Sequence, residues 1–259
     1  MKDITYLTNN GVDVETGIEL LGDIETYKET LLEFLNLADG KINNLKMTKD
    51  NDLENYSVFA HSIKSDARYL GFIKLSEIAL NHETQAKAGN KEYVNSTFDS
   101  FINEINKAKE IAKSFLGSYA EKQVVSSTQV ITDSTKAVLI VDDSEIIRDF
   151  LFKILGSEYE CIMADDGKKA IEILESDEKD RIKAMFLDLN MPNFNGFDVL
   201  DYFKEKNLFE KYPISIITGS DDKDSIDRAF KYPIIDMLVK PFNEKDVKRI
   251  VERTISFKR

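Results

Sequence analysis

The hydrophobic period of this chain changes near residue 137, and that change constrains the fold more than any other feature. Beyond it, short apolar runs of strand length alternate with amphipathic segments of helical length. The first run, Val138–Val141, is apolar throughout, which is typical of a strand buried on both faces. Further strands are predicted at Glu160–Ala164, Ala184–Asp188, Ile214–Thr218 and Ile235–Val239. This alternation predicts an α/β domain with a doubly wound, five-stranded parallel sheet.

Helices are predicted after each of these strands. The clearest runs from Glu145 to Leu155, with Ser144 expected to cap its first turn. The others are expected near residues 168–174, 197–206, 223–230 and 244–255.

Residues 1–117 keep a helical period and predict an all-α domain. Helices are expected at residues 14–21, capped by Asp13, and at about 24–47, 51–70, 72–88 and 92–116. Gly40 lies inside the second of these and argues against one continuous helix. Antiparallel helices with short connections predict a four-helix bundle preceded by a short extra helix.

A stretch rich in Ser, Thr, Gln and Val separates the two patterns. We therefore predict a helical bundle at 1–117, a linker at 118–136 and an α/β domain at 137–259. The total of 259 residues suits two ordinary domains.

The formal net charge of −12 shows no basic excess of the kind that binding to nucleic acid or an anionic membrane requires. No apolar run approaches the ~20 residues of a membrane span, and the N-terminus lacks the apolar segment of a signal peptide. We expect a cytoplasmic protein that has protein partners, without nucleic acid or membrane binding.

Polar side chains stand at the ends of four predicted strands. Asp142 and Asp143 follow the first strand, Asp188 ends the third, Thr218 ends the fourth and Lys240 follows the fifth. The carboxyl ends of parallel strands meet at one edge of a sheet, so these groups are expected to converge. Three carboxylates favour a hard divalent cation such as Mg²⁺, and the ammonium and hydroxyl groups suit phosphoryl oxygens. The alternative is that these residues only cap helices, start turns and face solvent.

Residues 137–258 resemble a response-regulator receiver domain, which has a flavodoxin-like fold. The resemblance is carried by Val141-Asp142-Asp143, Asp188…Met191-Pro192…Gly196, Thr218 and Lys240-Pro241-Phe242. It implies that Asp188 accepts a phosphoryl group and that Thr218 and Lys240 contact the phosphoryl oxygens.

The resemblance also implies a magnesium site. Asp143 and Asp188 would bind Mg²⁺ together with the backbone carbonyl of Asn190, and Asp142 would act through a water molecule. The Lys240–Pro241 bond would be cis. Receivers usually carry an aromatic residue three positions before the lysine, whereas this chain has Met237 there. A switch of the usual form is therefore in question.

In the N-terminal half, His61, Lys64, Ser65 and Arg68 share one helix face, turned away from the predicted apolar seam. An exposed imidazole is expected there, with a cation one turn on to stabilise negative charge. On spacing alone, a solvated helix face is the plainer interpretation. His82, in contrast, is expected to be packed in the bundle.

The segment Ala60-His61-Ser62-Ile63-Lys64-Ser65…Leu70-Gly71 resembles the phosphoacceptor motif of histidine phosphotransfer (HPt) domains, with Glu83 also at a familiar place. Many such domains have glycine where Ser65 stands. The resemblance implies that His61 is the phosphohistidine and that Lys64 supports it.

Together these features predict a two-component phosphorelay protein, not an enzyme with its own ATP-binding kinase domain. Its partners would be a histidine kinase, other receiver domains or HPt domains. Transfer between His61 and Asp188 within one chain is a further hypothesis. One alternative is a signalling scaffold that uses no phosphate chemistry. Another is an aspartyl-phosphate hydrolase, which would need a second Asp where Asn190 stands.

Overall fold

A computed structural model describes residues 2–117, 119, 137–219 and 223–257. The chain divides into two compact units, residues 1–128 and 129–259, and each is described by itself. The predicted linker at 118–136 lies outside the described residues, apart from residue 119. Within the described residues, no helix has the length and apolar character that crossing a bilayer requires.

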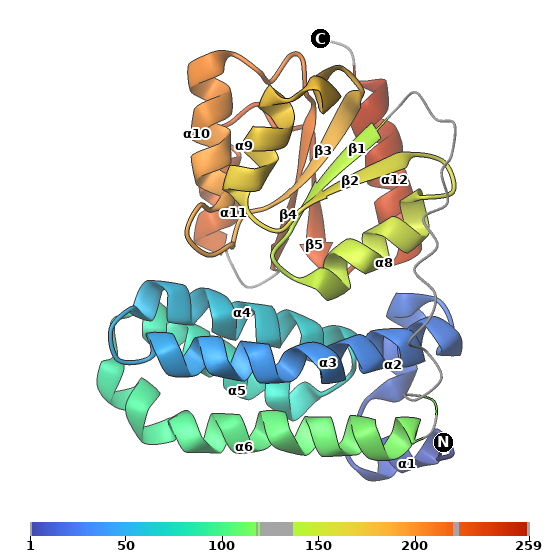
Figure 1. Cartoon of the computed structure of the whole chain (residues 1–259), viewed down its shortest axis with the longest axis vertical. Coiled ribbons are helices and arrows are strands. Elements are labelled where there is room, and N and C mark those ends of the chain that lie inside the picture. The colour runs from blue at the N-terminus through green and yellow to red at the C-terminus, as the bar shows by residue number, and fades with distance from the viewer. Residues whose placement is uncertain (1, 118, 120–136, 220–222, 258–259) are drawn as a thin grey trace. The chain divides into compact units, whose positions relative to one another are not determined.

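The N-terminal unit is all-helical (Figure 1). Its helices are α1 (Thr5–Asn9), α2 (Val14–Leu21), α3 (Ile24–Thr48), α4 (Leu53–Tyr69), α5 (Ile73–Lys87) and α6 (Lys91–Leu116). Helices α3 to α6 form a ring in which each helix packs on two others, so the unit is a four-helix bundle. Helix α1 was not predicted, because a five-residue helix is too short to show a period.

Side-chain caps explain where the bundle helices begin. Asp13, Asp23, Asp52 and Asn90 each accept a hydrogen bond from the backbone N–H three residues later, at the starts of α2, α3, α4 and α6. Gly40 does not interrupt α3, which is continuous across it. Packing of the apolar face therefore outweighs the propensity cost of one glycine.

The C-terminal unit contains a five-stranded parallel sheet in the order β2-β1-β3-β4-β5. The strands are β1 (Ala137–Val141), β2 (Glu160–Ala164), β3 (Ile182–Asp188), β4 (Ile214–Gly219) and β5 (Asp236–Lys240). The helices are α8 (Glu145–Leu155), α9 (Gly167–Glu175), α10 (Gly196–Lys206), α11 (Lys223–Ala229) and α12 (Glu244–Ser256). Strands and crossover helices thus alternate as predicted, which gives a flavodoxin-like fold.

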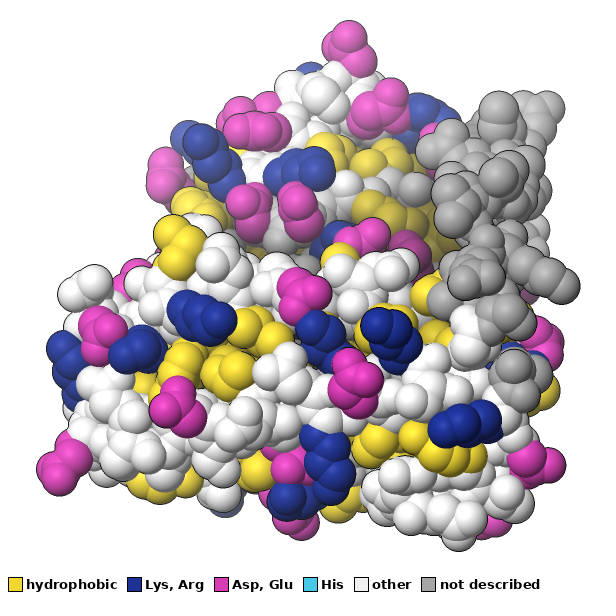
Figure 2. Space-filling view, turned by 60° about the horizontal axis from the view of Figure 1, so that its bottom comes forward, with side chains coloured by type: hydrophobic (Ala, Val, Ile, Leu, Met, Phe, Trp, Pro, Cys, Tyr) yellow, Lys and Arg dark blue, Asp and Glu magenta, His cyan; other side chains and the backbone are white. Residues whose placement is uncertain are grey.

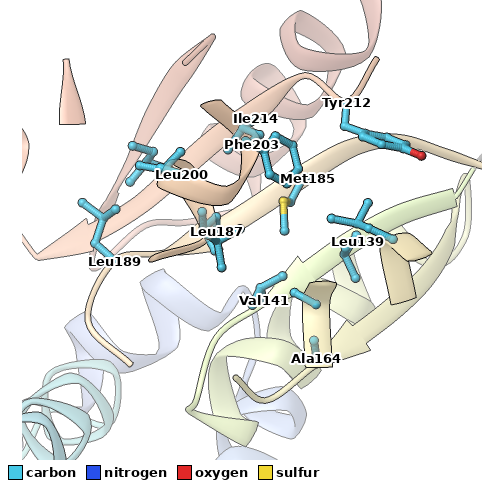
Figure 3. Packing of buried hydrophobic residues seen from close by; sticks show 14 of the residues in the cluster. Leu139, Val141, Ala164, Met185, Leu187, Leu189, Leu200, Phe203, Tyr212 and Ile214 are labelled. Atoms are coloured by element: carbon cyan, nitrogen blue, oxygen red, sulfur yellow. The ribbon is translucent and has the colours of Figure 1, made fainter. Parts of the chain in front are cut away.

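The helices cover both faces of this sheet, with α8 and α12 on one side and α9 and α10 on the other (Figure 1). Between the sheet and α10, side chains of β1 and β3 pack against Leu200 and Phe203 (Figure 3). Every residue of β1 is buried, as expected for a central strand of a doubly wound sheet. This packed layer holds the carboxyl ends of β1 and β3 beside each other.

Three local predictions need correction. Ser144 occupies the N-cap position of α8, but its side chain makes no capping hydrogen bond. Its backbone N–H instead donates to Oδ1 of Asp142, 2.9 Å away. Strand β3 begins at Ile182, two residues early, and β5 runs one residue later than predicted, so Lys240 is its last residue.

The charge on the surface is mixed. On the face shown in Figure 2, lysine and arginine side chains are interspersed with aspartate and glutamate, and no basic stripe runs across it.

Candidate functional site

Asp188 is the last residue of β3, and its side chain is fully buried. Its Oδ1 accepts a hydrogen bond of 3.1 Å from the backbone N–H of Asn190. Asn195 then caps α10 with a capping box, in which Asp198 binds back to the Asn195 N–H. The loop after Asp188 is therefore held at both ends.

Gly196 fits closely against this loop. A Cβ atom there would lie 2.2 Å from the carbonyl oxygen of Asp188 and 2.7 Å from Cα of Leu189. Gly196 N–H also donates to the Leu189 carbonyl at 3.2 Å. Only glycine allows α10 to start this close to the aspartate.

Lys240 links two carboxylates at the same edge of the sheet. Its Nζ donates to Oδ2 of Asp188 at 2.7 Å and forms an ion pair of 2.8 Å with Oδ2 of Asp142. All three side chains are at most 3% exposed. Although burial alone lowers the pKa of Lys240, Asp142 and Asp188 raise it above its ordinary value, so the ammonium stays charged.

The carboxyl group of Asp142 is fully buried. Burial raises the pKa of its carboxyl to about 6, and the Asp188 charge adds to this, while Lys240 and the Ser144 N–H act in the opposite direction. The half-buried Arg148 on α8 donates from Nη1 to the backbone carbonyl of Asp142 at 2.6 Å. Arg148 thus anchors the turn after β1.

Asp142, Asp143 and Asp188 form a three-carboxylate cluster whose ligand atoms all lie within 4.8 Å of one another. Carboxylate oxygens are the ligands that Mg²⁺ prefers, and Lys240 pairs with two of the three carboxylates. The donor set therefore fits a magnesium ion. Asn190 lies two residues after Asp188, in the loop where the resemblance places a carbonyl ligand.

Thr218 lies near the end of β4, is fully buried, and donates a long hydrogen bond of 3.4 Å to the Gly219 carbonyl. The Lys240–Pro241 bond is cis, as the resemblance implied. Met237 is half-buried on β5, in register with Ile216 of β4.

A second polar cluster lies in the bundle, around His61 on α4. Its Nδ1 lies 2.9 Å from Oε1 of Glu83 on α5, within hydrogen-bond distance. Lys64 forms an ion pair of 2.7 Å with Oε2 of Glu83, and Lys87 donates to Oε1 at 2.8 Å. Although burial alone raises the pKa of Glu83, the adjacent His61, Lys64 and Lys87 hold it well below its ordinary value. Glu83 is therefore an ionised acceptor.

The structure directs Nδ1 of His61 toward Glu83 on α5, and exposure of the imidazole to solvent stays a prediction. Its Nε2 has no hydrogen-bond partner among the described residues. With Nδ1–H donated to Glu83, Nε2 carries the lone pair. Ser65 and Arg68 follow His61 on the next two turns of α4.

His82 is a packed histidine, as predicted. Its Nδ1 lies 2.7 Å from the hydroxyl of Tyr56, its Nε2 lies 3.2 Å from that of Thr97, and its ring stacks on Phe101. Burial lowers the pKa of His82 to about 4.

Two residues that take part in these clusters were missed at the level of sequence. Lys87 is four residues after Glu83, a spacing typical of helical ion pairs, which could have indicated it. No sequence spacing could have indicated the role of Arg148, because its hydrogen-bond acceptor is a backbone carbonyl.

Comparison with known proteins identifies the C-terminal unit. The response regulator receiver domain model matches residues 138–252. The two-component response regulator ORR3 of Oryza sativa subsp. indica is 31% identical over 130 residues, which is 50% of this chain and 98% of that protein. The sensor histidine kinase TmoS of Ectopseudomonas mendocina is 31% identical over 121 residues, 47% of this chain and 12% of that protein.

Among solved structures, chemotaxis protein CheY4 of Vibrio cholerae matches with 28% identity and a TM-score of 0.41, covering 46% of this chain and 98% of its own. The family match coincides with the unit that carries Asp142, Asp143, Asp188 and Lys240. Through its C-terminal half, the chain belongs to the response regulator receiver domain family of two-component signalling.

Proposed function

We propose that this chain is a cytoplasmic phosphorelay protein in which phosphoryl groups move between His61, Asp188 and the matching sites of partner proteins. The bundle acts as an HPt domain and the α/β unit as its receiver. Receiver domains in general interact with histidine kinases and phosphotransfer proteins, and we propose partners of these classes. The chain is not a kinase, and its receiver promotes only the phosphorylation and dephosphorylation of Asp188.

The observation that carries this proposal is the state of the His61 ring. Glu83 accepts from Nδ1, and Nε2 is left without a hydrogen-bond partner among the described residues. A histidine that attacks phosphorus needs this arrangement, in which one nitrogen is held by an orienting carboxylate and the other offers its lone pair.

The receiver supplies the complementary acceptor. A carboxylate oxygen of Asp188 attacks phosphorus in line with the bond to the donor nitrogen, and the electron pair of that bond leaves with the imidazole. The Lys240 ammonium, which donates a hydrogen bond to Asp188 in this structure, would contact the phosphoryl oxygens. The Thr218 hydroxyl would contact them too.

Asp142, Asp143, Asp188 and the carbonyl of Asn190 would hold Mg²⁺. The ion supplies positive charge for the phosphoryl oxygens when it is bound. The backbone N–H of Asn190 keeps Oδ1 of Asp188 oriented toward the same edge of the sheet.

Phosphotransfer profiling tests this function. The full chain, with His61→Gln and Asp188→Asn variants beside it, would be incubated with phosphorylated candidate histidine kinases, receivers and HPt proteins. We expect acid-stable, base-labile label on Asp188 and acid-labile, base-stable label on His61, each lost in its own variant. If both variants accept label like the parent chain, the proposal fails.

Chemical phosphorylation separates the proposal from its alternatives. Incubation with Mg²⁺ and acetyl phosphate should give an adduct that needs Asp188. Turnover without an adduct would indicate a hydrolase, and neither turnover nor adduct would indicate a scaffold.

A further inference from the structure

Oε1 of Glu83 lies within hydrogen-bond distance of two donors. The His61 Nδ1 lies 2.9 Å from it, and the Lys87 ammonium lies 2.8 Å from the same oxygen. Lys64 faces the other oxygen, Oε2, at 2.7 Å. The charge of one carboxylate is therefore divided among three groups on two helices.

The two lysines differ in their surroundings. The Lys64 side chain is 1% exposed, whereas the Lys87 side chain is 44% exposed. Lys87 is the last residue of α5. An ammonium at this position can rotate into solvent at little cost, because water replaces its hydrogen bonds. Lys87 is thus the adjustable member of the cluster.

We propose that Lys87 tunes His61 as a phosphoryl acceptor by sharing the Glu83 oxygen to which the imidazole Nδ1–H donates. This inference rests on the proposed function of His61. Lys87 touches neither the phosphoryl group nor Nε2, so it is a positioning residue that acts through Glu83.

The chemistry of transfer explains the direction of the effect. The Nε2 lone pair forms the bond to phosphorus, the bond from phosphorus to the donor breaks, and its electron pair leaves with the donor. The Nδ1 proton stays on the ring, which gains positive charge as the new bond forms. A nearby carboxylate stabilises that charge, and a cation on the same carboxylate oxygen opposes it. Removing Lys87 therefore strengthens the hydrogen bond from His61 Nδ1–H to Glu83 Oε1 and accelerates phosphorylation of His61.

A purely structural role could also explain a lysine at the C-terminus of α5. A cation at a helix C-terminus and four residues after a glutamate stabilises the helix, whatever happens at His61. The test must therefore read the imidazole directly.

The experiment uses the full chain in an Asp188→Asn background, so that phosphate remains on His61. Nitrogen-15 NMR observes the Nδ1–H signal of His61, and His82, the chain's other histidine, serves as an internal reference. Phosphoramidate is the phosphoryl donor, with ammonia as the leaving group. Lys87→Met is compared with Lys87→Arg and with Lys74→Met, which removes a lysine of α5 that pairs with Glu104.

We expect Lys87→Met to shift the His61 Nδ1–H proton downfield and to raise the rate of phosphohistidine formation about three- to tenfold. Lys87→Arg and Lys74→Met should resemble the parent in both the His61 chemical shift and the rate of phosphohistidine formation. The His82 signal should keep its position in every variant. An unmoved His61 signal in Lys87→Met, or a shifted signal with an unchanged rate, overturns the inference. If no variant and no parent chain forms phosphohistidine while the signal still shifts, the proposed function fails and the hydrogen-bond competition stands.

Discussion

Lys240 donates a 2.7 Å hydrogen bond to Oδ2 of Asp188, and both side chains are buried at the carboxyl edge of the sheet. The ammonium also pairs with Asp142, so it bridges two carboxylates that would otherwise repel each other. Under the proposed function, the same ammonium would lie within reach of the oxygens of a phosphoryl group on Asp188.

Lys240→Met should therefore slow phosphorylation of Asp188 by acetyl phosphate about 10- to 100-fold, because the buried ammonium that would balance part of the phosphoryl charge is lost. Intact-mass measurement of the adduct over time gives the rate. Lys248→Met is the control, since Lys248 pairs with Glu244 on the exposed surface of α12. Equal rates in the parent and Lys240→Met would contradict the assigned role.

Asp143→Asn should weaken Mg²⁺ binding at least about tenfold, because it removes one of three clustered carboxylates. Isothermal titration calorimetry on the full chain measures the affinity. Asp246→Asn removes one negative charge from the half-exposed first turn of α12, where Asp246 lies 3.8 Å from Arg249, and should leave the affinity near that of the parent because Asp246 is not a member of the carboxylate cluster. A comparable loss in both variants would show a non-specific charge effect.

Gly196→Ala and Gly40→Ala should change stability in opposite directions. A Cβ at Gly196 meets the Asp188 carbonyl at 2.2 Å and should lower the free energy of unfolding by about 1–3 kcal/mol. A Cβ at Gly40 meets nothing within 4 Å on a helix and should raise it by about 0.5–1 kcal/mol. Urea unfolding followed by amide hydrogen exchange reads the two units separately. A tolerated Gly196→Ala would mean that the Asp188 loop is not held as tightly as the structure shows.

The bundle should lose stability as the pH falls from about 6.5 to about 4. The folded pKa of His82 is lowered to about 4 by burial, while its ordinary value is 6.5. The unfolded chain therefore binds more protons than the folded chain across this window. The stability that the neutral His82 contributes is fully present above pH 6.5 and is lost as the pH falls toward 4. The loss should be on the order of 1–2 kcal/mol. His82→Gln should flatten the dependence measured by urea unfolding at a series of pH values; an unchanged slope would assign it to other groups.

Much of the receiver site follows from sequence because parallel sheets bring strand ends together. Asp142, Asp188 and Lys240 could be placed at one edge from apolar runs alone, since a crossover connection returns each strand in the same direction. The cap at Asp13 and the seam through Tyr56 and Ala60 are local patterns, and both are present in the bundle.

The tertiary structure decided what local patterns cannot encode. The contact between His61 and Glu83 depends on how α4 and α5 pack, because the two residues lie 22 positions apart in the sequence. Arg148 binds a backbone carbonyl, which any sequence offers at any position. Sequence by itself therefore predicted the all-helical and α/β halves of the chain and the groups that we propose for phosphoryl chemistry. Packing decided which oxygen each donor meets, because hydrogen bonds depend on positions of a few tenths of an ångström that only the assembled helices and sheet define.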